Sequence, residues 1–367
     1  MLVKVIVIGA GAAGLAIGWR LAQAGADVRV LERGQPGRGA TWAAAGMIAA
    51  LQDCESELAR RAAELWPAFA QEIDQASGRP IAYQKNGGLA LARTTEERDA
   101  FLQSAREGEM LSPTAAREIE PRLSPELAGA LWIADEAKVD NRALGPALAA
   151  AFVRAGGSLA LNETVVRFEL RDNGIHGVRT PFALHNADCY VLAAGAWSGR
   201  IEGLPAEALP PVDPAKGEML ALEPPEGESL PGPSIVGADI YMVPQRGRLL
   251  VGATVQRVGF DSGLTSAAAE WLLERAQLLM PCLSGWKRVE HWAGLRPGSP
   301  DDLPILGRSI LDGLFVASGQ FRSGILYTPA IAEVVCALVL GKDSPVDITS
   351  FDPRRFGSTP AARNTRE

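Results

Sequence analysis

The chain has 367 residues, of which 47% are hydrophobic and 22% charged, so it is long enough to bury the core of one composite or two smaller globular domains. A formal net charge of −7 and the lack of a basic block argue against nucleic acid as a partner, because backbone phosphates need clustered Lys and Arg. No window has the ~18 uninterrupted apolar residues of a membrane-spanning helix, no secretory signal precedes the first strand, and we expect a cytoplasmic protein.

The cysteines and histidines show no metal-ligand spacing. Four cysteines occur, at Cys54, Cys189, Cys282 and Cys336. They lie far apart without a C-x-x-C pair, so we expect reduced, isolated thiols. The three histidines form no spaced set either, and no metal site is predicted.

The N-terminal segment predicts a βαβ unit. Residues 3–8, VKVIVI, are mostly β-branched and are followed by glycine, as in a buried parallel strand. Helix-forming residues follow at 12–24, and Gly25 supplies the stop. A second strand is expected at 27–32.

Helical patterns alternate with strand-like segments through the rest of the chain. Helices are expected at 55–77, 95–120, 139–155, 265–280 and 328–341, the last with proline in its first turn. Strands or hairpins are expected at 80–92, 164–180, 189–199, 218–223, 240–255 and 314–319. Asn-Gly turns at 86–87 and 173–174 mark two of the hairpins. The tail from about 352 is expected to be frayed.

The first strand runs into a glycine-rich turn, VIVIGAGAAG, with the spacing of a dinucleotide-binding loop. Gly9 permits the tight turn, Gly11 lets the backbone approach a pyrophosphate, and Gly14 lets helix and strand pack closely. The helix N-terminus would bind the pyrophosphate through free N–H groups. Glu32 ends the second strand, where a carboxylate accepts hydrogen bonds from an adenosine ribose. We therefore predict dinucleotide binding, with NAD and FAD both open and NADP disfavoured.

The segment after Glu32, RGQPGRGATWAAAGMIAA, is a glycine-rich turn followed by small residues. Small side chains would let the backbone lie against a flat ring. They would equally suit a helix start packed tightly on a sheet, and the residues alone leave both interpretations open.

Five motifs, spread in order over nearly the whole chain, together resemble the FAD-dependent D-amino-acid oxidase superfamily. They are GRGATWAAAGM, VDNRALGPAL, LAAGAWSG, WAGLRPGSPDDLPILG and SGQFRSGIL. The AAAGM run, with WAGLRPG followed by FRSGIL, is similar to the glycine oxidase branch, which is associated with thiazole formation in thiamine biosynthesis.

The resemblance implies an α/β fold, in which a Rossmann-like FAD-binding domain is interleaved with an α+β substrate domain that contains a large antiparallel sheet. The expected FAD domain comprises 1–79, 139–211 and 292–350, the substrate domain 80–138 and 212–291, and a flexible tail 351–367. The interleaving of helical and hairpin-rich segments agrees with this organisation.

The resemblance also implies FAD-dependent oxidative deamination of glycine and other small amines, such as sarcosine and small D-amino acids. Hydride would pass from the α-carbon to flavin N5, the imine would hydrolyse to an oxoacid (glyoxylate from glycine) and ammonia, and oxygen would yield hydrogen peroxide. FAD is expected to be non-covalent, because no cysteine lies between Arg296 and Arg322. The amino acid and oxygen are the expected partners, and a homo-oligomer is expected.

The resemblance assigns FAD contacts to three parts of the chain. At the phosphate loop and adenosine they are Gly9, Gly11, Ala12, Ala13, Gly14, Glu32 and Arg33. Further along they are Ala40, Thr41, Ala45, Gly46, Met47, Val166 and Gly195, with Val166 contacting adenine through its backbone. Around the isoalloxazine they are Gln320, Phe321, Arg322, Ser323, Gly324, Ile325 and Leu326. The helix that follows would direct its positive end at the ring.

The expected catalytic residues are Arg296, Tyr241 and Arg322. A guanidinium matches a carboxylate with two parallel hydrogen bonds, and burying it unpaired is costly, so the substrate carboxylate would pair with Arg296. Pro297 and Gly298 would fix the loop that aims this arginine. Tyr241 would donate its hydroxyl to the same carboxylate, and Arg322 would support the network. Without the resemblance, these residues also suit a solvated loop arginine and a half-buried strand tyrosine.

Three positions depart from the family pattern. Gln320 stands where histidine is common, Asp239 where a different polar residue occurs, and Val255 where relatives have a larger methionine. The smaller valine is expected to widen the pocket, which puts a strict preference for glycine in doubt.

Three alternative functions stay open. An amine dehydrogenase with a non-oxygen acceptor would be reduced quickly by its substrate and reoxidised slowly in air. An NAD-linked dehydrogenase would be colourless when purified. A non-catalytic flavin-binding module would be yellow but unchanged by glycine, sarcosine or D-alanine.

Overall fold

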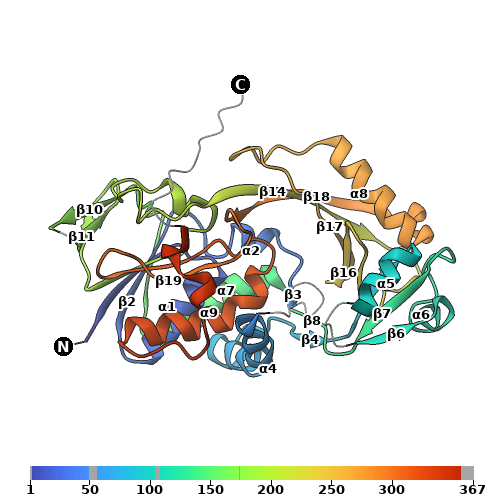
Figure 1. Ribbon diagram of the computed structural model, residues 1–367, viewed down its shortest axis with the longest axis horizontal. Helices are drawn as coiled ribbons and strands as arrows, with labels where there is room; N and C mark the ends of the chain where they lie inside the picture. The colour runs from blue at the N-terminus through green and yellow to red at the C-terminus, as the bar shows by residue number, and fades with distance from the viewer. Residues whose placement is uncertain (1, 49–55, 104–107, 173, 357–367) are drawn as a thin grey trace.

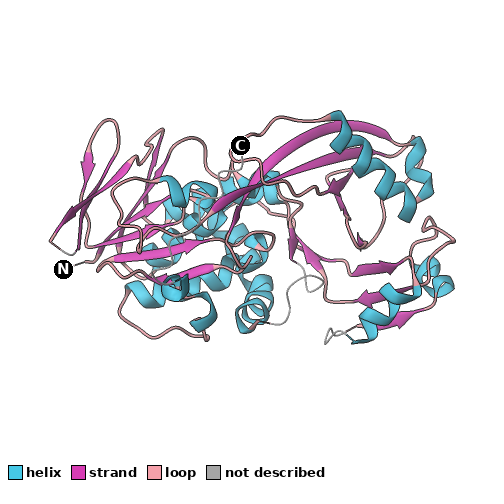
Figure 2. Ribbon diagram, turned by 45° about the horizontal axis from the view of Figure 1, so that its top comes forward, coloured by secondary structure: helices cyan, strands magenta, loops and turns pink. Residues whose placement is uncertain are grey.

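The computed structural model describes residues 2–48, 56–103, 108–172 and 174–356. Two regions lie side by side (Figures 1 and 2): one is built on a parallel sheet covered by helices, the other on a large, mostly antiparallel sheet. Segments far apart in the sequence contribute to each region. These features confirm the predicted fold class, a Rossmann-like domain interleaved with a second α+β region.

The predicted βαβ unit forms the centre of the parallel sheet. It consists of β1 (Lys4–Ile8), α1 (Ala12–Gln23) and β2 (Asp27–Glu32). The strand order is β19-β20-β13-β1-β2-β9, and only β19 at the edge pairs antiparallel within the described sheet. The added strands are β9 (Ser158–Leu161), β13 (Cys189–Leu192), β19 (Ile305–Arg308) and β20 (Leu314–Ser318).

Helices cover one face of the parallel sheet, and a small antiparallel sheet covers the other. The helices are α1, α4 (Glu57–Ser77), α7 (Asn141–Arg154) and α9 (Gly324–Val339). Their shared core includes the fully buried rings of Trp19, Trp66 and Phe152. On the other face lie β10 (Arg167–Arg171), β11 (Gly174–Arg179) and β12 (Leu184–His185), which confirm the predicted hairpin near 164–180.

The large sheet has the strand order β18-β14-β17-β16-β15-β5-β7-β6. Its strands are β5 (Gly88–Ala92), β6 (Glu109–Leu111), β7 (Gly129–Ile133), β14 (Asp213–Glu223), β15 (Ser234–Val236), β16 (Tyr241–Gln245), β17 (Arg248–Gly252) and β18 (Lys287–Gly298). Helix α8 (Ser266–Leu279) packs on the outer face, where Leu272 and Leu279 meet the apolar side chains of β14 and β17. The opposite face turns toward α2 (Ala40–Ala43), through Trp292 and Met219.

Shorter elements connect the two regions. A small sheet joins β3 (Met47–Ile48), β8 (Ala137–Lys138) and β4 (Gln84–Lys85), while α5 (Thr95–Gln103) and α6 (Pro113–Ile119) belong to the large-sheet region. The 3-10 helices are η1 (Gly195–Arg200), η2 (Pro281–Gly285), η3 (Thr349–Phe351) and η4 (Pro353–Phe356).

Three predicted elements are wrong in detail. The segment 80–92 is not a hairpin, because β4 pairs with β8 whereas β5 pairs with β7 and β15. The segment 95–120 contains two helices with β6 between them. The last long helix begins at Gly324 rather than at 328, so Pro329 lies in its second turn.

The proposed domain boundaries remain a prediction, with two adjustments. Strand β18 stays in the large sheet as far as Gly298, so a boundary at 292 would divide one strand. The start of the predicted tail is packed: Phe351 is buried, and Arg355 lies 2.8 Å from Asp301. Residues 357–367 of that tail, like Cys54 and Asn173, lie outside the described residues.

Candidate active site

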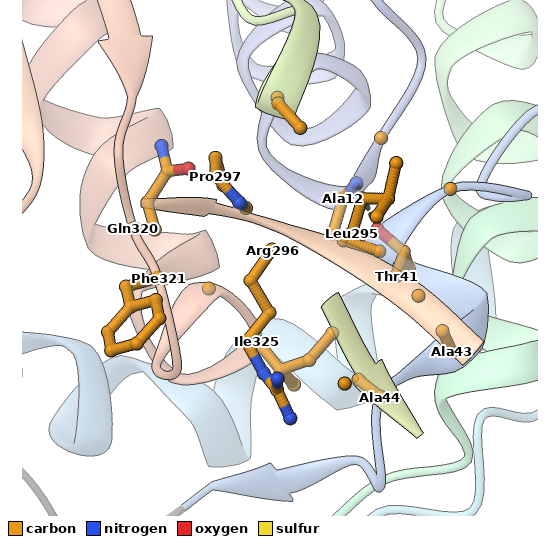
Figure 3. Close-up of a pocket in the computed structure, with 18 of the residues that line it drawn as sticks. Ala12, Thr41, Ala43, Ala44, Leu295, Arg296, Pro297, Gln320, Phe321 and Ile325 are labelled. Carbon is orange, nitrogen blue, oxygen red and sulfur yellow. Dashed lines mark hydrogen bonds between the residues drawn. The ribbon is translucent and has the colours of Figure 1, made fainter. Parts of the chain in front are cut away.

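A cavity of about 1270 Å³ runs between the two regions, from the end of β2 to the start of α9. All of the predicted FAD contacts except Gly14 line it, and so do the three predicted catalytic residues. A Cβ on Gly14 would overlap the carbonyl oxygen of Gly9, so this glycine serves close packing of α1 on β1 and does not contact the cavity. Figure 3 shows the Arg296 side chain leaving its strand and entering this space.

The loop between β1 and α1 has the geometry that its glycines predict. Gly9 has φ +104°, and a Cβ there would lie 2.5 Å from the carbonyl oxygen of Ala193. Gly11 borders open space, with only the Thr41 hydroxyl within 4 Å of an added Cβ. The Ala12 N–H donates to Thr41 Oγ1 at 3.0 Å, which joins α1 to α2. The N–H group of Ala13 in the first turn of α1 lacks a helical acceptor, and this residue lines the cavity, as at an anion-binding helix N-terminus.

Glu32 and Arg33 form one end of the cavity. Both carboxylate oxygens of Glu32 accept backbone N–H groups, Oε2 from Ala10 at 2.8 Å and Oε1 from Gly34 at 2.9 Å. Each oxygen keeps a second lone pair, which a ribose hydroxyl can use. The Arg33 guanidinium lies 3.4 Å from the centre of the Trp197 ring. Burial lowers the pKa of Arg33, and the neighbouring Glu32 opposes that shift.

The predicted backbone contact of Val166 stays a prediction, although both backbone groups of this residue already have partners. The Val166 N–H donates to the Arg179 carbonyl of β11 at 2.9 Å, and the Val166 carbonyl accepts the Glu202 N–H at 3.1 Å. Val165 also lines the cavity, is 8% exposed, and has no backbone bond to any described residue. Val165 is therefore the better candidate for a backbone contact to a base.

The start of α9 forms the other end of the cavity. The Phe321 N–H donates to the Pro297 carbonyl at 3.0 Å, which holds the turn before α9 against β18. Gln320 in this turn is 7% exposed, and its Nε2 has no partner among the described residues. The Trp66 indole donates to the Leu326 carbonyl at 2.8 Å and fixes the first turn of α9 from behind. Free N–H groups and an unpaired amide thus face the same space.

Arg296 lies on a strand, β18, whereas the sequence predicted a loop. Its Nη1 donates to the Thr254 carbonyl at 3.1 Å, and it forms no ion pair with any residue in the described ranges. The guanidinium lies over Gly217 on the neighbouring strand β14, where a Cβ would be 2.5 Å from Cζ. The remaining donors of a half-buried cation are therefore available to an anion in the cavity.

Tyr241 approaches Arg296 from the other side of β14. Its ring covers Gly252 on β17, where a Cβ would lie 2.8 Å from the hydroxyl oxygen. The hydroxyl lies 3.7 Å from Met219 Sδ. Met219 is two residues from Gly217 on one strand, a separation of about 6.6 Å. The guanidinium and the phenol thus lie near neighbouring positions of β14, and both line the same cavity.

Arg322 and His291 differ from this pair. Arg322 is exposed at the cavity edge, with its guanidinium 5.1 Å from the Phe321 ring, and its supporting role stays a prediction. His291 does not line the cavity; its Nε2 lies 2.9 Å from Glu218 Oε2 on the outer face of the sheet. Sequence reasoning missed Gly217 and Thr254, although a glycine within the strand pattern of KGEML is a recognised sign of close approach.

The cavity fits FAD on three observations. The glycine-rich loop leaves open space at Gly11. At one end of the cavity, both carboxylate oxygens of Glu32 accept backbone N–H groups and can each accept one more hydrogen bond. The buried Nε2 of Gln320 has no partner among the described residues. FAD would be held by these groups and by the first turns of α1 and α9. The arginine and tyrosine then lie at the end that would receive a substrate.

Comparison with known proteins agrees with this geometry. A sequence model of the family described as "FAD dependent oxidoreductase" (DAO) matches residues 4–338. Glycine oxidase of Geobacillus kaustophilus is 35% identical over 367 residues, covering 96% of each chain. Its crystal structure has a TM-score of 0.90 at 33% identity, covering 96% of this chain and 99% of the other.

A longer relative is the bifunctional protein ThiO/ThiG of Trichormus variabilis, which is 33% identical over 364 residues. The match covers 96% of this chain but 55% of the relative, so the chain spans about half the length of such bifunctional proteins. Within residues 2–48, 56–103, 108–172 and 174–356, no helix is both long and apolar enough to cross a membrane.

Proposed function

Because this chain belongs to the FAD-dependent oxidoreductase (DAO) family, we propose that it catalyses the oxidative deamination of glycine and other small amino acids. The observation that carries the proposal is the Arg296 guanidinium, which has no ion pair with any described residue and lines the same cavity as Tyr241. The chemistry supplied by bound FAD is the two-electron oxidation of the substrate Cα–N bond, with oxygen as the final acceptor and hydrogen peroxide as its product. Water then hydrolyses the imine to an oxoacid and ammonia.

Arg296 and Tyr241 are proposed to bind and orient the substrate. The free donors of the guanidinium would take the α-carboxylate, and the phenol would add one hydrogen bond. Held at this end, the amino acid would keep its α-carbon and amine directed away from β14. Two fixed points on one carboxylate restrict rotation, which is how positioning lowers the barrier of a bimolecular step.

No general base is required if the amine arrives neutral. Among the described residues that line the cavity, none is a histidine, and the acidic ones are Glu32, Glu163, Glu202 and Asp239. The first three lie on segments at the adenosine end. A substrate whose amine arrives neutral, with the lone pair of its nitrogen available, therefore fits this site better than one whose ammonium group must first be deprotonated by the protein.

We propose that substrates larger than glycine are accepted. Val255 lines the cavity and is 43% exposed, and the lining continues to Thr265 and Trp271 of the α8 region. Sarcosine and small D-amino acids would occupy this extension. The likeness to ThiO/ThiG further supports a role in forming the thiazole of thiamine, and a cytoplasmic location would suit that role.

Anaerobic spectroscopy tests the proposal directly. The purified holoenzyme is mixed with glycine, sarcosine, D-alanine or L-alanine, and the flavin absorbance is followed before and after air is admitted. Rapid loss of absorbance with a small amine, followed by fast recovery in air and peroxide formation, is expected. Slow recovery in air would indicate a dehydrogenase with another acceptor, and an unchanged spectrum with every amine would disprove the proposal.

Substitution of Arg296 identifies the carboxylate site. Arg296→Ala should raise the amine concentration needed for half-maximal bleaching by at least about tenfold to a hundredfold, the effect expected for charge-assisted hydrogen bonds. Arg296→Lys keeps the charge but loses the planar fork, so we expect an intermediate loss. An unchanged concentration dependence in both variants would remove the assigned role.

A further inference from the structure

A buried ion pair lies behind the strand position that carries the Arg296 guanidinium. Lys216 and Glu218 flank Gly217 on β14, and they are 2% and 0% exposed. Side chains alternate along a strand, so both point to the outer face while Gly217 faces the cavity. Lys216 Nζ lies 3.1 Å from Glu218 Oε1. Two ions at this depth are costly to bury unless further hydrogen bonds satisfy them.

Apart from the 2.9 Å contact between His291 Nε2 and Glu218 Oε2 on β18, those further hydrogen bonds go to the end of the segment 254–265. Lys216 Nζ donates to the Gly263 carbonyl at 2.8 Å. Glu218 Oε2 accepts the Thr265 N–H at 3.0 Å, and Glu218 Oε1 accepts the Thr265 hydroxyl at 3.2 Å. The Thr265 hydroxyl also caps α8 by accepting the Ala268 N–H at 3.2 Å. The ion pair thus ties both this segment and the start of α8 to β14.

The beginning of the same segment is bound to the same two residues through the backbone. The Lys216 N–H donates to the Gln256 carbonyl at 2.8 Å, and the Gln256 N–H donates back at 2.9 Å. The Glu218 N–H donates to Thr254 Oγ1 at 2.9 Å. Thr254 in turn presents its carbonyl to Arg296 Nη1 at 3.1 Å. A continuous chain of contacts therefore runs from the buried pair to the substrate-binding arginine.

Between these anchors, residues 257–262 are largely exposed. An exposed stretch with few buried contacts opens easily unless its ends are fixed. Burial raises the pKa of Glu218, but hydrogen bonds from Thr265 and Lys216 outweigh that effect and lower the pKa overall. The carboxylate is therefore ionised at neutral pH, as the anchoring contacts require.

We propose that Lys216 and Glu218 are positioning residues for Arg296. They close the segment 254–265 onto β14 and so hold the Thr254 carbonyl where it orients the guanidinium over Gly217. The inference rests on the proposed carboxylate-binding role of Arg296. Neither Lys216 nor Glu218 itself lines the cavity, and both act through Thr254.

Carboxylate binding by the holoenzyme tests this inference without turnover. Acetate and acetamide are titrated calorimetrically into wild type, Glu218→Gln and Lys216→Met, each with FAD bound. Wild type should prefer acetate, and each variant should raise the Kd for acetate about tenfold, the worth of one charge-assisted hydrogen bond, with little change for acetamide. A Kd for acetate that stays within about twofold of wild type in both variants would overturn the inference.

A matched control separates positioning from general loss of stability. Glu120 is also buried, at 2% exposure, and pairs with Arg122 at 2.7 Å, away from the cavity. Glu120→Gln should lower the melting temperature but leave acetate binding unchanged. If Glu120→Gln raised the Kd for acetate as much as Glu218→Gln does, the effect would be structural and the positioning role would be wrong.

A double variant keeps the test available if a single substitution prevents folding. Lys216→Met/Glu218→Met leaves no unpaired buried charge, and such apolar replacements are often tolerated. It still removes the anchors at Gly263 and Thr265, so the Kd for acetate should again rise about tenfold. An unchanged Kd would overturn the inference alone. Equal affinity of wild type for acetate and acetamide would instead disprove the carboxylate role of Arg296.

Discussion

Gly217 on β14 lies directly beneath the guanidinium of Arg296 on β18, so closely that a Cβ at residue 217 would be 2.5 Å from Cζ. The guanidinium of Arg296 occupies the space that a side chain at residue 217 would fill. Its φ is not in the left-handed region, so backbone strain does not explain the glycine. If Arg296 binds the substrate as proposed, a larger side chain at residue 217 would disturb that binding.

Gly217→Ala should displace the arginine and impair use of the substrate. The methyl group would push Nη1 away from the Thr254 carbonyl, and we expect kcat/KM for glycine to fall about tenfold to a hundredfold, mainly through KM. Steady-state kinetics measures this change. Gly285→Ala is the control, because an added Cβ there meets no atom within 4 Å. A KM for Gly217→Ala equal to that of the control would contradict the assignment.

Gln320→Leu should weaken FAD binding. Its buried Nε2 has no partner among the described residues, so a bond to the cofactor would satisfy it. Loss of one neutral hydrogen bond predicts a Kd for FAD about threefold to tenfold higher, measured by reconstituting apoprotein and following flavin fluorescence. Gln23→Leu, on the exposed side of α1, serves as the surface control. Equal FAD affinity of both variants would argue against this contact.

Asp239→Asn should change selectivity among substrates. Within residues 217–297, Asp239 and Arg296 are the charged side chains that line the cavity. The Asp239 carboxylate is half exposed and lies 3.8 Å from Arg275, a contact of the weak surface type. We expect kcat/KM to fall about threefold for amino acids with a cationic substituent, but not for neutral ones of equal length. An equal change in kcat/KM for cationic and neutral amino acids would show that the charge at residue 239 does not contribute to substrate selectivity.

Lys138→Met should alter the pH dependence of stability. Lys138 is 8% exposed, its Nζ donates to the Pro244 carbonyl, and burial lowers its pKa from 10.5 to about 8. Between those two values the folded state binds fewer protons than the unfolded state, so the contribution of this group to stability rises with pH. Below pH 8 the buried ammonium opposes folding, and its replacement should stabilise the protein by about 2 kcal/mol after solvent screening.

Urea unfolding of wild type and Lys138→Met at pH 7 and at pH 10 would measure this effect. The difference in free energy of unfolding between Lys138→Met and wild type should be smaller at pH 10, because Lys138 is then neutral in folded wild type. Lys85→Met is the comparison, since Lys85 is exposed and its pKa is raised by the hydrogen bond to Asp135. A constant difference between Lys138→Met and wild type at both pH values would show that Lys138 does not titrate in this window.

Local patterns predicted the elements whose neighbours in space are also neighbours in sequence. The β1-α1-β2 unit, the β16-β17 hairpin and the dinucleotide loop were all predicted, because turn glycines and side-chain periodicity specify them within about 30 residues. The segment 80–92 failed because strand pairing there is non-local: β4 and β5 join different sheets. A turn signal at residues 86–87 cannot indicate which partner each strand will find.

The sequence by itself determined that a glycine-rich loop of the dinucleotide-binding pattern, an acid at the end of the second strand and an arginine-bearing motif occur in one chain. Only the tertiary structure decided that β18 lies beside β14, which places Arg296 over Gly217 and Lys216 and Glu218 behind it. About 80 residues separate these strands along the chain. The register of these two strands depends on burying the side chains on both faces of the large sheet. The free energy of that burial is gained only when the complete fold forms, so no short segment of sequence specifies the register.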